Sequence, residues 1–167
     1  ALAYDPALGV LYAGGQFTVV DAQVRNRIVQ LEAPTGFATT WNAGSNNQVF
    51  AIALQGTNVF VGGQFTTIGG QTRNRIAALD ANSALATAWN PDAGNIVQAL
   101  AVSGSTVYAG GDFLTIGGQN RSRVAALDVS TGLATAWNPS AFGTLSVLGV
   151  GPNQEVFAGG SFSGIGG

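Results

Sequence analysis

The cations of the chain are its six arginines, which come as three Arg-X-Arg pairs. The pairs recur at steps of 48 residues and are Arg25/Arg27, Arg73/Arg75 and Arg121/Arg123. Guanidinium groups bind carboxylates and phosphates through paired hydrogen bonds, so a ring of such pairs would bind acidic glycans or phosphates. Since every copy of a repeat meets the same packing problem, the regular spacing favours a structural role. In that role each pair bridges successive units through acids or main-chain carbonyls.

Three acidic residues keep the same step of 48 residues: Glu32, Asp80 and Asp128. Each ends an apolar run just before a turn, where a carboxylate accepts hydrogen bonds from the following main-chain N–H groups. A Ca²⁺ site is the alternative, because hard cations prefer oxygen ligands. No Asp-X-Asp-X-Asp run supports that alternative.

Other acids break the repeat, and these are better candidates for ligand binding. We predict this role for Asp21, Asp92 and Asp112, while Asp5 and Glu155 are also out of phase. Two acids are the minimum for a glycoside hydrolase. The sequence places no two of them at a working separation, so we predict no catalytic residue, with a carboxylate-based hydrolase or lyase as the alternative.

Composition removes several kinds of chemistry. The chain of 167 residues has no Cys and no His, and its six cations are all Arg. Disulfides, zinc sites, thiolate nucleophiles and Schiff bases are therefore excluded, and we predict no cofactor. A net charge of −2 gives no basic surface for nucleic acid, and no apolar run is long enough to span a membrane. The low charge also suggests an extracellular or cell-surface location.

A repeat of about 48 residues governs the architecture. The sequence Gly-Gly-X-Phe recurs at residues 14–17, 62–65, 110–113 and 159–162, at steps of 48, 48 and 49. A unit of this length cannot bury its own apolar face and must stack on its neighbours. Trp41, Trp89 and Trp137 recur at steps of 48, so we expect them in the core between units.

Each unit contains four short apolar runs separated by turns. In the second copy they are residues 49–54, 59–61, 75–80 and 85–89, which predicts a four-stranded antiparallel sheet. In the first run, alternation predicts that Val49, Ala51 and Ala53 share one small-sided face, directed to a crowded centre. The neighbouring residues would then pack on the adjacent unit.

Four strands per unit of this length are typical of a β-propeller blade. We predict an all-β chain with blades at residues 1–43, 44–94 and 95–142 and a half blade at 143–167. Propellers close with about 4–8 blades, so we expect the chain to be part of a six- or seven-bladed propeller of roughly 290–340 residues.

Residues 65–80, followed by Ala88-Trp89-Asn90-Pro91, resemble the delta-60 repeats of bacterial β-propellers. The chain is also distantly similar to kelch repeats and, at residues 127–132, to the turn of quinoprotein blades. The delta-60 resemblance implies an extracellular or envelope-associated repeat domain inside a large protein. It brings no catalytic motif.

These observations favour a non-catalytic scaffold or recognition module of a secreted or cell-surface bacterial protein. Its expected ligand is protein or carbohydrate, bound by propeller loops, and its nearest partner is the rest of the same propeller chain. The alternative is a structural subunit that self-associates through open blade edges.

Overall fold

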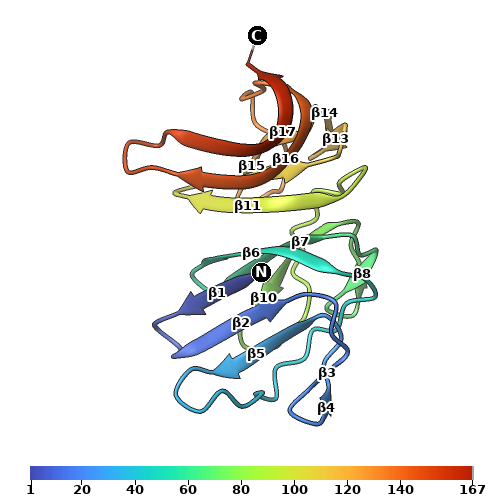
Figure 1. Cartoon of the computed structure of the whole chain (residues 1–167), viewed down its shortest axis with the longest axis vertical. Coiled ribbons are helices and arrows are strands. Elements are labelled where there is room, and N and C mark those ends of the chain that lie inside the picture. The colour runs from blue at the N-terminus through green and yellow to red at the C-terminus, as the bar shows by residue number, and fades with distance from the viewer. Residues whose placement is uncertain (167) are drawn as a thin grey trace.

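The computed structural model describes residues 1–166, which form strands and no helix (Figure 1). Three antiparallel three-stranded sheets follow one another, and a two-stranded hairpin comes last. The first sheet contains β1 (Leu2–Asp5), β2 (Val10–Gly14) and β5 (Ile28–Glu32). The second contains β6 (Val49–Gln55), β7 (Asn58–Gly63) and β10 (Ile76–Asp80). The third contains β11 (Val97–Ser103), β12 (Thr106–Gly111) and β15 (Val124–Asp128), and the hairpin is β16 (Ala141–Val150) and β17 (Val156–Ile165).

A small hairpin follows the second strand of each sheet. The three hairpins are β3 (Val19–Val20) with β4 (Gln23–Val24), β8 (Thr67–Ile68) with β9 (Gln71–Thr72), and β13 (Thr115–Ile116) with β14 (Gln119–Asn120). The sheets stack face to face, and the first sheet and the β16–β17 hairpin lie at opposite ends of the stack (Figure 1). The all-β antiparallel fold is therefore confirmed. Residues 1–166 include no helix that could cross a membrane.

The fourth apolar run of each unit is shorter than predicted. It meets the third strand at a single bridge, such as Leu79 with Ala86. Two hydrogen bonds flank that bridge, from Asp80 N to Leu85 O and from Thr87 N to Ala78 O. Beyond Thr87 the chain turns so that Trp89 is buried, which ends the pairing. The prediction of four-stranded blades is therefore wrong: each complete sheet has three strands and one bridge.

A β-bulge changes the predicted alternation of the first strand. The register of β6 shifts between Val49 and Ala51, and β11 shifts at the equivalent place. Val49 consequently packs in the same cluster as Ile52 and Leu54, whereas Ala51 packs toward the next sheet. The predicted common face of Val49, Ala51 and Ala53 is wrong, because the extra residue of a bulge reverses the alternation.

The Gly-Gly doublet lies opposite this bulge. A Cβ at Gly62 would lie 2.7 Å from Val97 Cγ1, and one at Gly63 would lie 2.3 Å from Gln48 O. No larger residue is accommodated at either position without movement of the neighbouring strand. The doublet thus permits two strands and two sheets to approach closely.

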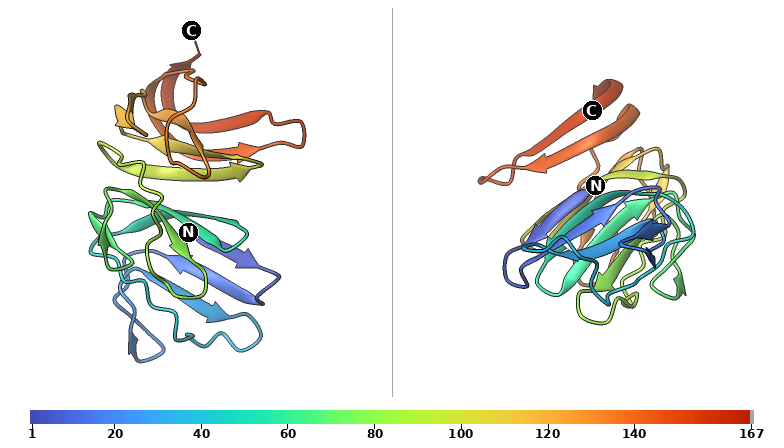
Figure 2. Two further views of the ribbon diagram at one scale, coloured as in Figure 1. Left: turned by 180° about the vertical axis from the view of Figure 1, so that it is seen from behind. Right: turned by 60° about the horizontal axis from the view of Figure 1, so that its bottom comes forward.

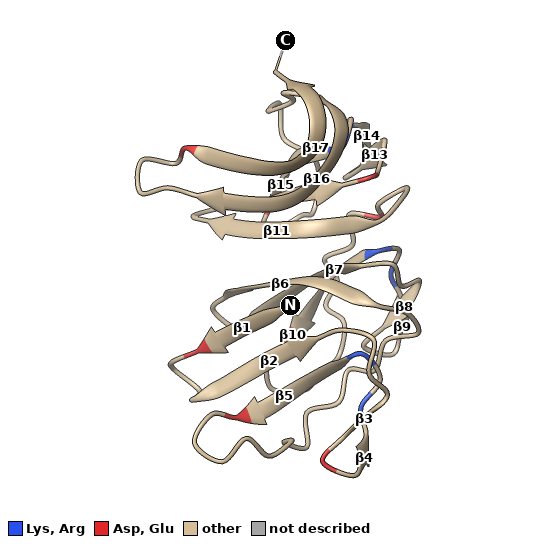
Figure 3. Ribbon diagram, viewed as in Figure 1, with Lys and Arg blue, Asp and Glu red and all other residues tan. Residues whose placement is uncertain are grey.

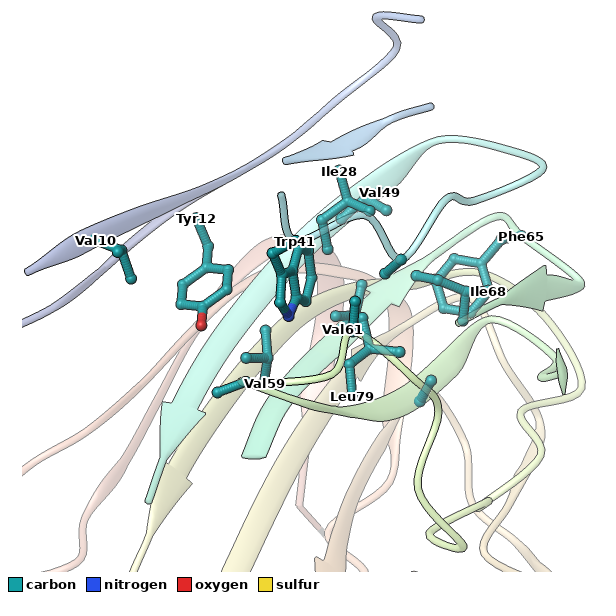
Figure 4. Packing of buried hydrophobic residues seen from close by; sticks show 14 residues of the cluster. Val10, Tyr12, Ile28, Trp41, Val49, Val59, Val61, Phe65, Ile68 and Leu79 are labelled. Carbon is teal, nitrogen blue, oxygen red and sulfur yellow. The ribbon is translucent and has the colours of Figure 1, made fainter. Parts of the chain in front are cut away.

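Each tryptophan joins its own sheet to the next. Trp41 contacts Tyr12 edge to face with ring centroids 5.3 Å apart (Figure 4). Its Nε1 donates to Asp80 O at 3.1 Å. Trp89 repeats this contact with Phe60 and donates to Asp128 O at 3.0 Å. The two tryptophans are 4% and 5% exposed.

We expect Trp89→Phe to lower the free energy of unfolding by about 2 kcal/mol, because it removes buried volume and one hydrogen bond. Trp137 is half-buried and its Nε1 donates to no acceptor within residues 1–166. Trp137→Phe, the matched control, should therefore cost less than about 1 kcal/mol. Urea unfolding followed by circular dichroism measures both, and equal losses would contradict the role assigned to the indole bond.

Candidate functional site

The first arginine of each pair holds the fourth run in place. Arg73 donates from Nη2 to Thr87 O at 2.6 Å and from Nη1 to Thr72 O at 2.8 Å. The equivalent long-range bonds run from Arg25 to Thr39 and from Arg121 to Thr135. The Nε–H of each of these arginines is buried without a partner. These guanidinium groups therefore serve the main chain of their own unit.

The second arginine of each pair binds the segment that leads into the next unit, or, for Arg123, the first residue of β16. Arg75 adopts a left-handed backbone conformation with φ of 62°, and its Nη1 donates to Ala93 O at 3.0 Å. Arg27 and Arg123 have φ of 64° and 66° and donate to Ser45 O and Ala141 O. Figure 3 shows the cations gathered on the side of the small hairpins. Their engagement with carbonyls supports the structural interpretation over an open anion-binding ring. The predicted bridging of successive units is wrong for the first arginine of each pair, which bonds within its own unit, and holds for the second.

The periodic acids stabilise turns. Asp80 Oδ1 accepts hydrogen bonds from Ser83 N at 2.7 Å, Ser83 Oγ at 2.8 Å and Asn82 N at 3.1 Å. Asp128 is bound in the same way by Thr131 and Ser130. The main-chain N–H of Ser83, then its hydroxyl, lowers the pKa of Asp80 below 3.8, and Thr131 does the same for Asp128.

Glu32 lies at the corresponding turn of the first sheet, where it accepts a hydrogen bond from Thr35 Oγ1 at 2.8 Å. No three metal-ligating side chains come together in the described part of the chain. The Ca²⁺ alternative at the periodic acids thus gains no support from their geometry.

The out-of-phase acids lie on different elements. Asp112 accepts from Gln98 Nε2 at 2.8 Å and from Thr144 Oγ1 at 2.5 Å, so it joins β11 to β16. Asp21 lies in the β3–β4 turn with φ of 52°. Asp92 lies in the connector after the second sheet. The structure therefore does not bring the three candidate acids to one site.

Asp5 and Glu155 also stabilise turns. Asp5 Oδ1 accepts hydrogen bonds from Ala7 N at 2.9 Å and Leu8 N at 3.2 Å. Both carboxylate oxygens of Glu155 are bound by Asn153, whose side chain lowers the Glu155 pKa.

Asp92 lines an open cleft of about 580 Å³ between its connector and the β13–β14 hairpin. The cleft is lined by Asn90, Pro91, Asp92, Thr115, Ile116, Gly117, Gly118, Gln119, Asn120, Gly132 and Leu133. Its walls are held together by main-chain hydrogen bonds from Gly117 N to Pro91 O at 2.7 Å and from Gly94 N to Thr115 O at 2.9 Å. A volume of this size is typical of small-ligand sites.

The cleft lining combines polar side chains with the apolar residues Pro91, Ile116 and Leu133. Asp92 has φ of 54° and accepts a hydrogen bond from Asn74 Nδ2 at 2.8 Å. Asn90, Gln119 and Asn120 are exposed amides on its walls. The sequence singled out Asp92 because it breaks the repeat. The sequence did not indicate Gln119, because Gln71 occupies the equivalent position in the preceding copy and a repeated residue suggests a structural role.

Two segments, residues 9–36 and 58–85, match the family model described as "Domain of unknown function (DUF5122) beta-propeller". Stacked antiparallel sheets together with this match define a β-propeller repeat protein. This is the family of the delta-60 repeats, so the resemblance seen in the sequence is confirmed over these two segments.

No curated protein matches the chain. Among solved structures, it is similar to the computationally designed protein Ika4, with a TM-score of 0.60 at 15% identity over 95% of this chain and 88% of that one. The computationally designed protein Ika8 matches with a TM-score of 0.57 at 16% identity, over 95% of this chain and 41% of that one. At these identities the similarity shows the fold alone.

We expect acid to destabilise the fold partly through Asp80 and Asp128. A carboxyl whose pKa is lowered by folding stabilises the fold above its unfolded pKa, and this is lost as the pH falls through the folded pKa. The window therefore lies below the usual value of 3.8. The Asp80→Asn/Asp128→Asn variant should lose less stability than the parent between about pH 5 and pH 2.

Urea midpoints across that pH range measure the effect. Asp21→Asn is the matched control, because Asp21 accepts no hydrogen bond among the described residues, and it should keep the parent's acid dependence. An unchanged slope in the double variant would refute the assignment.

Proposed function

We propose that the chain is a non-catalytic recognition module of a larger secreted or cell-surface bacterial protein. It binds carbohydrate through the cleft between the connector at residues 90–92 and the β13–β14 hairpin. The observation that best supports carbohydrate binding is this cleft, whose walls expose one carboxylate and three amides. A sugar hydroxyl both donates and accepts hydrogen bonds, so it can pair with either kind of group.

Charge narrows the ligand class. The lining residues include one acid and no cation, which favours neutral or amino sugars over acidic ones. They also include no aromatic ring on which a sugar face would stack. We therefore expect weak binding, on the order of a millimolar Kd, as suits a module that acts in several copies.

The wider setting of the proposal is a closed propeller of six or seven blades. Both ends of the stack expose apolar side chains whose counterparts inside it are buried or half-buried. Further blades of the same chain would cover these ends, and the loops of all blades would then share one rim.

Catalysis has weaker support. Asp112 is held by Gln98 and Thr144, and Asp92 lies in the connector after the second sheet. An acid pair needs two carboxyl groups facing one bond, at about 5–10 Å from each other.

We expect neutral oligosaccharides to shift the side-chain amide resonances of Asn90, Gln119 and Asn120 in a ¹⁵N-labelled chain. The probes are malto-, cello- and chito-oligosaccharides. Asp92→Asn keeps the tolerance for a left-handed backbone but removes the charge, so it should weaken binding about five- to tenfold.

Asp21→Asn, the same change outside the cleft, should leave binding as it is. Resonances that stay still with every probe at about 50 mM, or that move only outside the cleft, would refute carbohydrate binding here.

Self-association is the second candidate, favoured by the exposed end faces. Leu2 and Tyr4 are 71% and 57% exposed on the first sheet, and Val147 and Phe157 are both 63% exposed on the final hairpin. Phe60, the counterpart of Phe157 in the second sheet, is 0% exposed. The two ends are the two halves of the interface seen between internal sheets, so head-to-tail association would cover both.

In that case Phe157→Ser should lower the mass seen by sedimentation equilibrium at a given concentration. Leu133→Ser is the control, because Leu133 is 61% exposed but lines the cleft between the second and third units. A parent chain that remains monomeric at about 100 μM would rule this candidate out.

A further inference from the structure

The final hairpin keeps the position and register of the first two strands of a unit. Gly166 N donates to Pro139 O at 2.8 Å, as Gly117 N does to Pro91 O at 2.7 Å one unit earlier. The β16–β17 pair therefore corresponds to β11–β12. In all three earlier units a third strand pairs with the outer edge of the second: β5 with β2, β10 with β7 and β15 with β12.

The corresponding edge of β17 has no strand within residues 1–166. In the second sheet this pairing runs from Ile76 opposite Gly62 to Asp80 opposite Asn58. The equivalent segment of β17 is Val156 to Gly159, with Glu155 at its start. Figure 2 shows the hairpin standing at the outside of the stack, with β17 away from the sheets beneath it.

The aromatic pair beneath this hairpin, Tyr108 and Trp137, is not covered by a third strand among the described residues. Tyr12 and Phe60 are 0% exposed in their interfaces, whereas the equivalent Tyr108 is only half-buried. Trp137 keeps the edge-to-face contact with Tyr108, at 5.5 Å between centroids. Its Nε1–H nevertheless has no acceptor among the described residues. Trp41 and Trp89 donate to the carbonyl of the last residue of the next unit's third strand.

We propose that the edge of β17 and the Tyr108–Trp137 pair together form a docking surface for one added β-strand. This inference concerns a surface separate from the carbohydrate cleft. Its occupant runs antiparallel to β17 and has the character of residues 75–80, namely an arginine, four apolar residues and an aspartate. The aspartate main-chain carbonyl accepts the Trp137 indole hydrogen bond.

The internal interfaces specify which side chains face the pair. In β10, Ala77 and Leu79 pack in the cluster that contains Tyr12 and Trp41. In the occupant, the second and fourth apolar residues therefore face Tyr108 and Trp137. A second copy of the chain is a poor occupant, because its own third strands β5, β10 and β15 are already paired.

The test uses the whole chain and a synthetic peptide with the sequence of residues 73–84. The three indole N–H resonances of the ¹⁵N-labelled chain are observed during the titration. We expect the peptide to shift the Trp137 resonance and the amides at residues 156–159, and to leave Trp41 and Trp89 unchanged. The buried tryptophans thus serve as controls within the same spectrum.

A matched peptide carries Ala77→Pro and Ala78→Pro. Successive N–H groups of a strand point to opposite edges, so replacing both removes the one that pairs with β17. This peptide should not bind. In the chain, Trp137→Phe should weaken binding of the parent peptide about five- to tenfold, because one hydrogen bond is lost. Leu133→Ala should leave binding of the parent peptide unchanged, because Leu133 lines the separate cleft.

Three outcomes of the peptide titration would overturn the proposal. They are the absence of any shift at millimolar peptide, equal shifts of all three indoles, and equal binding of the proline peptide. A Trp137 resonance that moves with chain concentration and not with peptide would also overturn it, because a second copy would then be the occupant.

Discussion

The hydrogen bond from an indole N–H to a carbonyl of the next unit is the interaction on which the stack depends. It places a large aromatic side chain at the centre of each interface and fixes its orientation by a polar contact. Trp41 and Trp89 make this bond at 3.1 Å and 3.0 Å, and the edge-to-face partner of each is buried. Where the bond is missing, at Trp137, the partner Tyr108 is also only half-buried. Bond and burial therefore accompany one another at these three positions.

The arginines add a second link between units by a different route. Arg75 reaches forward to the connector, while Arg73 holds the fourth run of its own unit. Carbonyl acceptors suit a chain with little charge, since no carboxylate has to be desolvated beside each guanidinium. The repeated arginines therefore have structural roles. The polar groups that remain available to bind a ligand lie mainly in connectors and turns.

The sequence predicted the strands, the stacking and the role of the tryptophans because all three follow from a period that recurs in phase. It failed where a local feature overrode a regular pattern. Val49 faces the other way because a bulge shifts the register, and the fourth run stops early because Trp89 turns inward. The cleft was predictable only in part: Asp92 breaks the repeat, whereas Gln119 keeps it. Which residues line the same cleft depends on how two neighbouring units pack against each other. The sequence of a single unit does not contain that information.

The one-dimensional order of the stack has a consequence for its motions. Each sheet touches only its neighbours, so local opening of a unit costs the contacts on its two sides and little else. β7, which is enclosed on both faces, should exchange its amide hydrogens most slowly, and exchange should quicken toward either end. Fraying would thus spread inward from the termini, and the middle of the molecule would be the last part to open.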